Sequence, residues 1–128
     1  MSGGERPKGF VPGRFPIDAY GNGGFRFADM SHKGSILALP SGIYAWSPVS
    51  IAELTPQSFD LIRREADAID TLLIGTGADP AFLDDAIVWR LREGRMAVDA
   101  MTTGSAARTY NIMLGENRRV AAALIAVA

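Results

Sequence analysis

The polar residues of this sequence that could bind or act on a ligand fall in two short stretches. The first is GTGADP, which begins at Gly75, the last residue of the apolar run TLLIG. The second is MTTGSAARTYN, where Arg108, Tyr110 and Asn111 interrupt a series of small residues. Glycine lets a backbone approach a ligand closely, hydroxyl groups donate hydrogen bonds, and the arginine fork binds carboxylate or phosphate groups. The candidate residues for ligand or partner binding are Gly75, Thr76, Gly77, Thr102, Thr103, Ser105, Arg108, Tyr110 and Asn111.

Both stretches join a predicted strand to a predicted helix. If the two strands are parallel neighbours, the loops 75–79 and 102–105 lie together at the carboxyl edge of the sheet, where open α/β sheets bind ligands. Free N–H groups at the two helix starts would favour an anion there. However, GTG matches neither G-x-G-x-x-G nor a Walker A loop, and Asp79 would compete with a phosphate. Glycines in a tight turn explain the loop without a ligand, so both interpretations remain open.

Arg108 also has two interpretations. In the first, it anchors a carboxylate or phosphate while Tyr110 and Asn111 orient the ligand. In the second, which we favour, Arg108 forms an ion pair with Asp99, the one charge in the predicted strand MAVDAM. Tyr110 would then bury its ring and bond its hydroxyl to the backbone.

Composition removes several kinds of chemistry. A chain of 128 residues fits one domain, and its lack of cysteine excludes disulfides, thiolate metal sites and cysteine nucleophiles. The single histidine, His32, gives no basis for a histidine-rich metal centre or a serine–histidine–aspartate triad. We therefore predict no catalytic residue, no metal and no cofactor. This favours a non-enzymatic role, with a small-molecule or anion-binding domain, even an enzyme, as the alternative.

Apolar periodicity predicts the elements that position these residues. Turns rich in glycine, asparagine and proline divide IDAYGNGGFRF and GSILALPSGIYAW into hairpin strands. Helices then alternate with strands from Thr55 onward, with helix starts at Thr55–Pro56, at Asp79–Pro80 and at Thr102 or Thr103. Strands are expected at 71–75, at 96–101 and in RRVAAALIAVA, which is apolar almost throughout and therefore central. The order predicts an α/β domain over residues 15–128, with N-terminal hairpins, after a flexible tail over residues 1–14.

Five stretches carry a family resemblance: IDAYGNGGFRF, GSILALPSGIYAW, LLIGTG, MTTGSAARTYN and NRRVAAALI. In this order and spacing they resemble a small family of domains of unknown function. That family includes mitochondrial complex I assembly factor 3 and the adipogenesis-associated human domain protein. The resemblance implies a three-layer α/β fold around a mixed sheet. For the mitochondrial relative, it implies a role in assembling a respiratory complex through protein contacts.

The expected partner is therefore another protein. It would bind at the carboxyl-edge loops or at exposed aromatic residues of the hairpins. The net charge of −1 gives no reason to expect nucleic acid, and the longest apolar run, 120–128, is too short for membrane insertion. No signal or transit peptide is visible, so we expect a cytoplasmic protein, monomeric or weakly dimeric through a hairpin edge strand.

Overall fold

Two β-sheets organise the chain, of which this computed structural model describes residues 10–128. Among these residues, the larger sheet has six strands in the order β1-β6-β5-β9-β7-β8, and the smaller has three in the order β2-β3-β4. The strands are β1 (Val11–Pro12), β2 (Ala19–Gly21), β3 (Gly24–Phe27), β4 (Met30–Lys33), β5 (Ser35–Leu39), β6 (Gly42–Trp46), β7 (Thr71–Gly75), β8 (Ala97–Met101) and β9 (Val120–Leu124). The larger sheet is mixed, because β7 runs parallel to β8 and β9 while β5 runs antiparallel to β6 and β9.

The last strand lies inside the larger sheet, as its composition predicts. All five residues of β9 are buried, and three of them are the alanines at 121–123. Alternate residues of β9 face opposite sides of the sheet. Small side chains there let layers approach closely on both sides, which is why the strand can be central.

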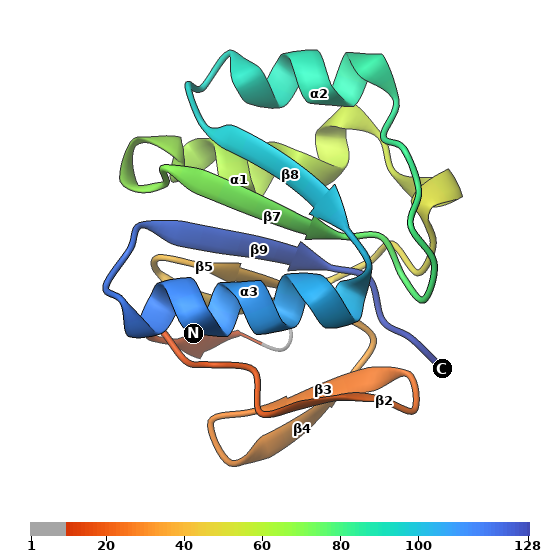
Figure 1. Ribbon diagram of the computed structural model, residues 1–128, viewed down its shortest axis with the longest axis vertical. Coiled ribbons are helices and arrows are strands. Elements are labelled where there is room, and N and C mark those ends of the chain that lie inside the picture. The colour runs from red at the N-terminus through yellow and green to blue at the C-terminus, as the bar shows by residue number, and fades with distance from the viewer. Residues whose placement is uncertain (1–9) are drawn as a thin grey trace, which may run out of the picture.

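Helices cover the two faces of the larger sheet. The α-helices are α1 (Asp60–Arg64), α2 (Asp85–Arg92) and α3 (Thr103–Gly115), and shorter 3-10 helices span Ile51–Glu53, Pro56–Phe59 and Ala66–Ala68. Figure 1 shows α3 in front of the sheet, α1 behind it, and the hairpin sheet below α3.

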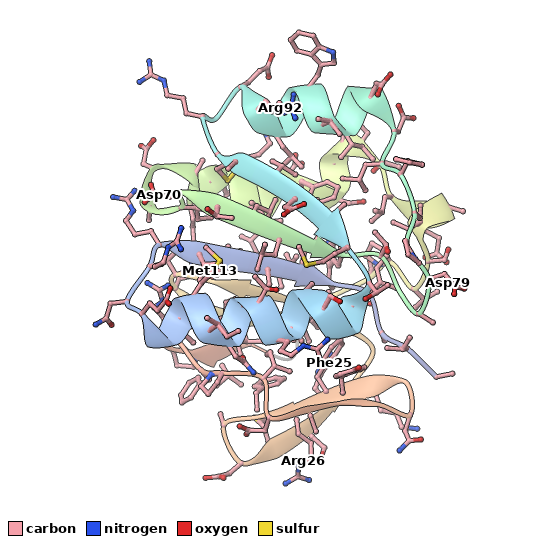
Figure 2. All side chains as sticks on the ribbon, in the orientation of Figure 1. Phe25, Arg26, Asp70, Asp79, Arg92 and Met113 are labelled. Carbon is pink, nitrogen blue, oxygen red and sulfur yellow. The ribbon has the colours of Figure 1, made fainter. Side chains whose placement is uncertain are left out.

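Two hydrophobic clusters fill the spaces between these layers. Phe59, Ile62, Ile87 and Leu91 pack with Leu72 and Ile74 in one cluster. The other unites Tyr110 and Met113 of α3, Phe25 and Phe27 of the hairpin sheet, and Leu73 and Ala122. Figure 2 shows Met113 between α3 and the sheet. The three-layer α/β fold with a mixed sheet is therefore confirmed.

The helix start predicted at Asp79–Pro80 is wrong. Residues between β7 and α2 form a loop instead, in which the Thr76 hydroxyl donates to the carbonyl of Asp79 at 2.8 Å. Helix α2 begins only at Asp85, because the Asp84 carboxylate accepts a hydrogen bond from the N–H of Ala86 and caps the helix. A proline after an aspartate is compatible with a helix start but does not force one.

The other two predicted helix starts are confirmed. Pro56 opens a 3-10 helix, and the N–H of Thr55 donates to the Ser58 hydroxyl at 3.0 Å. That segment breaks into short pieces rather than one long helix. At the third start Thr102 is the cap, because its hydroxyl accepts from the N–H of Ser105 at 3.3 Å.

The N-terminal region differs from the prediction in two respects. Most of the predicted tail lies outside the described residues, but Val11–Pro12 form β1 and pair with β6, so strand pairing begins before residue 15. The stretch containing His32 is strand β4, which the predicted strand order does not include. As a result β2, β3 and β4 form a sheet of their own.

Candidate functional site

The two strand-to-helix loops do meet at the carboxyl edge of β7 and β8, as the sequence predicts. The Thr103 hydroxyl joins them, because it donates to the carbonyl of Ile125 at 2.6 Å and accepts from the N–H of Gly77 at 3.0 Å. The N–H of Thr103 also donates to the carbonyl of Gly77 at 2.9 Å. A Cβ on Gly75 would lie 2.8 Å from Thr103 Cα, so glycine at 75 allows the strand to pass close to the helix. These residues hold the loops to each other.

The remaining hydroxyl groups of the loops also face the chain. Thr76 is buried, and its hydroxyl lies within hydrogen-bond distance of the carbonyls of Asp79 and Met101. Thr102 caps α3. Ser105 is half-buried, and its hydroxyl has no hydrogen bond within residues 10–128. Of the loop hydroxyls proposed to bind a ligand, only that of Ser105 is therefore free to do so.

Tyr110 and Asn111 attach α3 to the segment that precedes β2. The Asn111 amide oxygen accepts from the N–H of Ile17 and its amide nitrogen donates to the carbonyl of Ile17, both at 2.8 Å. Tyr110 is almost fully buried, and its hydroxyl donates to the carbonyl of Phe15 at 3.4 Å. Burial raises the pKa of Tyr110 to about 12, against an opposing effect of Arg14. The side chains of Tyr110 and Asn111 therefore form hydrogen bonds within the protein.

The ion pair expected between Arg108 and Asp99 is absent from the described residues. Both side chains are exposed, so Asp99 needs no buried partner. Arg108 instead lines a groove of about 360 Å³ between β2 and α3, together with Asp18, Tyr20 and Gly104. This groove includes Gly104 of the 102–105 loop but not Gly75, Thr76 or Gly77, so Arg108 belongs to a different surface from the 75–79 loop.

Most of the hairpin aromatics belong to the core. Phe25, Phe27, Tyr44 and Trp46 are buried, whereas Tyr20 is 48% exposed. The predicted aromatic patch on the hairpins is therefore reduced to one residue.

A surface with two exposed aromatic residues lies at the β8 end of the larger sheet. Phe82 in the loop before α2 is 99% exposed and Trp89 on α2 is 75% exposed. Beside Phe82 runs a groove of about 410 Å³ between α2 and β8, with Val88, Val98 and Ala100 in its lining. We call Phe82, Trp89 and this groove the α2–β8 face.

The α2–β8 face also includes an open sheet edge. β8 is the last strand of the larger sheet, so no described strand pairs with its outer side. Sequence reasoning missed this face, although one signal was present. Trp89 follows the buried Ile87 by two positions, which turns it away from the apolar stripe of its helix.

The described residues show no metal centre and no membrane span. Between residues 10 and 128, histidine, aspartate and glutamate side chains nowhere gather in a group of three that could hold a metal ion. Among the helices of this region, none combines the length and the apolar composition needed to cross a bilayer.

Comparison with known proteins places the chain in a family. Residues 17–125 match the family described as "Protein of unknown function (DUF498/DUF598)". The chain belongs to this family. It is 38% identical over 123 residues to an uncharacterized protein of Rhodobacter capsulatus, an alignment covering 94% of this chain and 90% of that protein.

Another relative has a named role. The chain is 30% identical over 109 residues to NADH dehydrogenase [ubiquinone] 1 alpha subcomplex assembly factor 3 of Xenopus tropicalis. The match covers 85% of this chain but only 60% of the assembly factor. The family resemblance read from the five sequence stretches is thus confirmed.

The fold is also found among solved structures. A crystal structure titled as an outer membrane protein from Bartonella henselae is 50% identical, with a TM-score of 0.88. The match covers 91% of this chain and 98% of that one. The architecture described above is therefore shared with a solved structure.

Proposed function

We propose that this protein acts by binding another protein, in the manner of an assembly factor, and that it does so through the α2–β8 face. The observation that carries the proposal is the exposure of Phe82, which is 99% exposed at a groove lined by Val88, Val98 and Ala100 together with Asp85 and Arg92. Large aromatic side chains at the surface are the usual anchors of protein interfaces. Burying one such ring contributes about 1.5–3 kcal/mol to binding.

The surroundings of Phe82 fit an interface better than a small-ligand site. Trp89 supplies a second exposed aromatic ring on the neighbouring helix. The edge of β8 offers unpaired backbone groups to an incoming strand, which is a common mode of peptide recognition. Phe82 and residues of the edge strand β8 line the same groove, which favours a partner that covers both.

The relatives support the same class of function. The name of the Xenopus relative states a role in the assembly of NADH dehydrogenase. Because this chain spans about 60% of that protein's length, we extend only the general property of partner binding to it. We place this activity in the cytoplasm, and the protein in its free state as a monomer or weak homodimer.

The alternative is a small anion held by the loops at 75–79 and 102–105. Their hydrogen bonds weigh against it, because Thr76 and Thr103 direct their hydroxyls to carbonyls of the chain. A thermal-shift screen with phosphate, nucleotides and small carboxylates addresses this alternative directly. Stabilisation that disappears in Ser105→Ala would favour the loops over the α2–β8 face.

A cross-linked pull-down from the native cell tests the proposal. The variant Phe82→Ser/Trp89→Ser removes both aromatic rings, and Ile112→Ser is the matched control because Ile112 is 59% exposed on α3. All three proteins should melt alike, since substitutions at such exposed positions change stability by less than about 0.5 kcal/mol.

We expect the wild type and the Ile112 variant to recover the same discrete protein from the soluble fraction, and the double variant to lose it. Recovery of that protein by all three forms would place the interface elsewhere. Recovery of nothing by any form would contradict partner binding.

A further inference from the structure

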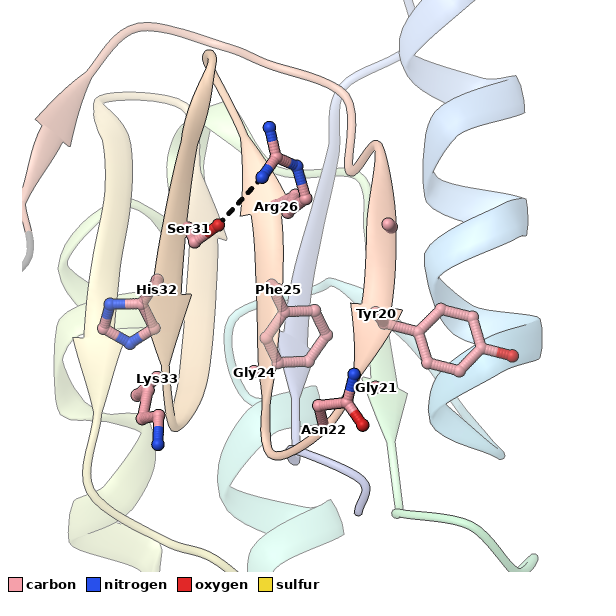
Figure 3. Close-up of a pocket in the computed structure, with 10 residues that line it drawn as sticks. Tyr20, Gly21, Asn22, Gly24, Phe25, Arg26, Ser31, His32 and Lys33 are labelled. Atoms are coloured by element: carbon pink, nitrogen blue, oxygen red, sulfur yellow. Dashed lines mark hydrogen bonds between the residues drawn. The ribbon is translucent and has the colours of Figure 1, made fainter.

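The outer face of the hairpin sheet carries a pocket that the proposed function does not use. Its volume is about 290 Å³, and residues from β2, β3 and β4 line it (Figure 3). Strand register divides these residues into two faces, since directly opposed residues of antiparallel strands point to the same side. Tyr20, Phe25 and His32 are cross-strand partners and share one face of the sheet. On that face Phe25 packs into the core.

The opposite, outward side consists of two rows across the three strands. In the first row Ala19 faces Arg26, which faces Ser31. In the second row Gly21 faces Gly24, which faces Lys33. We call these six residues the hairpin pocket face. Arg26 and Lys33 are its only charged members, and Figure 2 shows Arg26 extending away from the body of the protein.

The second row of the hairpin pocket face has almost no side chains. A Cβ on Gly24 would lie 2.1 Å from the carbonyl oxygen of His32, so the close contact between β3 and β4 requires glycine. Gly21 has a φ of +130°, which also requires glycine, and a Cβ there would meet nothing within 4 Å. Gly24 is buried and adds no side chain beside Arg26 and Lys33, and the surface over Gly21 is open.

Both Arg26 and Lys33 have N–H groups that form no hydrogen bond within the described residues. Arg26 donates one hydrogen bond, from Nη1 to the Ser31 hydroxyl at 3.1 Å, which steadies the guanidinium and leaves its other N–H groups unused (Figure 3). Within residues 10–128, neither Arg26 nor Lys33 forms an ion pair, and no aspartate or glutamate lines the pocket. An arginine guanidinium and a lysine ammonium in a pocket without carboxylate groups complement an anion.

We propose that the hairpin pocket face binds a small organic anion that carries two or more carboxylate or phosphate groups. Arg26 binds one group through its fork, and Lys33 binds a second. Diagonal neighbours on adjacent strands have Cα atoms about 7–8 Å apart, a span that suits two linked anionic groups rather than a single small ion. The open space over Gly21 provides room for such a molecule beside the two cations.

Titration of the ¹⁵N-labelled protein with pyrophosphate and, separately, with citrate tests this site by NMR at low ionic strength. The amides of β2, β3 and β4 should shift saturably with at least one of the two anions. Arg26→Gln and Lys33→Gln should each weaken binding about fivefold, and raising the salt concentration should weaken it in the wild type. Pyrophosphate binding alone would assign phosphate ligands, and citrate binding alone would assign carboxylates.

Two further variants make the result specific to the pocket. Ala19→Glu keeps both cations but places a carboxylate in the first row, and it should abolish binding. Arg90→Gln/Arg92→Gln removes two exposed cations of α2 and should leave binding unchanged. The unperturbed part of each spectrum reports whether the variant is folded. Absence of saturable shifts with both anions, or equal binding by wild type and Arg26→Gln/Lys33→Gln, would overturn the proposal.

Discussion

Replacing Asn111 with alanine should destabilise the protein strongly, although the residue carries no charge and lies only half-buried on α3. Its amide makes two hydrogen bonds of 2.8 Å to the backbone of Ile17, a residue that is 4% exposed. Each bond is worth about 1 kcal/mol net, and leaving both backbone groups of Ile17 unpaired adds roughly 1 kcal/mol more. The higher helix propensity of alanine offsets about 0.5 kcal/mol of this loss of stability. The expected loss is therefore roughly 2–3 kcal/mol.

Urea denaturation followed by tryptophan fluorescence measures this loss, because Trp46 is buried in the core. For a domain of this size the predicted change lowers the melting temperature by roughly 10 °C. Arg108→Ala is the control on the same helix, and it should change stability by less than about 0.5 kcal/mol because the side chain is exposed. A loss below about 0.5 kcal/mol for Asn111→Ala, or an equal loss for Arg108→Ala, would refute the structural role we assign to Asn111.

Three further predictions concern the same region. Thr103→Val should cost about 2–3 kcal/mol in chemical denaturation, because the buried carbonyl of Ile125 and N–H of Gly77 lose their partner; an unchanged midpoint would contradict this. Gly75→Ala should cost about 1–3 kcal/mol, since its Cβ would lie 2.8 Å from Thr103 Cα, and a neutral result would show that the strand can shift away. Burial raises the pKa of Tyr110 from 10.0 to about 12, so the folded state holds the phenolic proton more tightly than the unfolded chain. The free energy of unfolding should therefore fall by up to about 2–3 kcal/mol between roughly pH 10 and 12, and Tyr110→Phe should remove this part of the decline.

The order of elements could be predicted from the sequence because it depends on local patterns. The apolar run of β9, with its three alanines, indicates a strand covered on both faces whatever the rest of the chain does. Glycine and asparagine between short apolar runs likewise predict the β2–β3 turn, where Asn22 and Gly23 have φ values of +53° and +80°. The start of α2 was missed because Asp79 and Asp84 are both acceptable caps, and only tertiary contacts select between them.

The buried ring of Tyr110 and its hydrogen bond to the backbone could be predicted, but the contact partners of the candidate residues could not, because they lie in distant parts of the chain. Asn111 binds Ile17 and Thr103 binds Gly77, and neither pairing leaves a periodic signal in the sequence. Side chains that the sequence suggests for hydrogen bonding to a ligand therefore form hydrogen bonds within the fold. The exposure of Phe82 could not be predicted either. Phenylalanine is usually buried, and nothing in the loop sequence around Phe82 indicates that its ring faces solvent.

Site-specific photo-cross-linking tests most directly whether the α2–β8 face binds a protein partner. A photoreactive phenylalanine analogue would replace Phe82 in one form and Ile112 in another, and both forms would be irradiated in the native cell. The account predicts one discrete adduct to a second protein from position 82 and none from position 112. Adducts from position 112 alone, or from neither position, would contradict it.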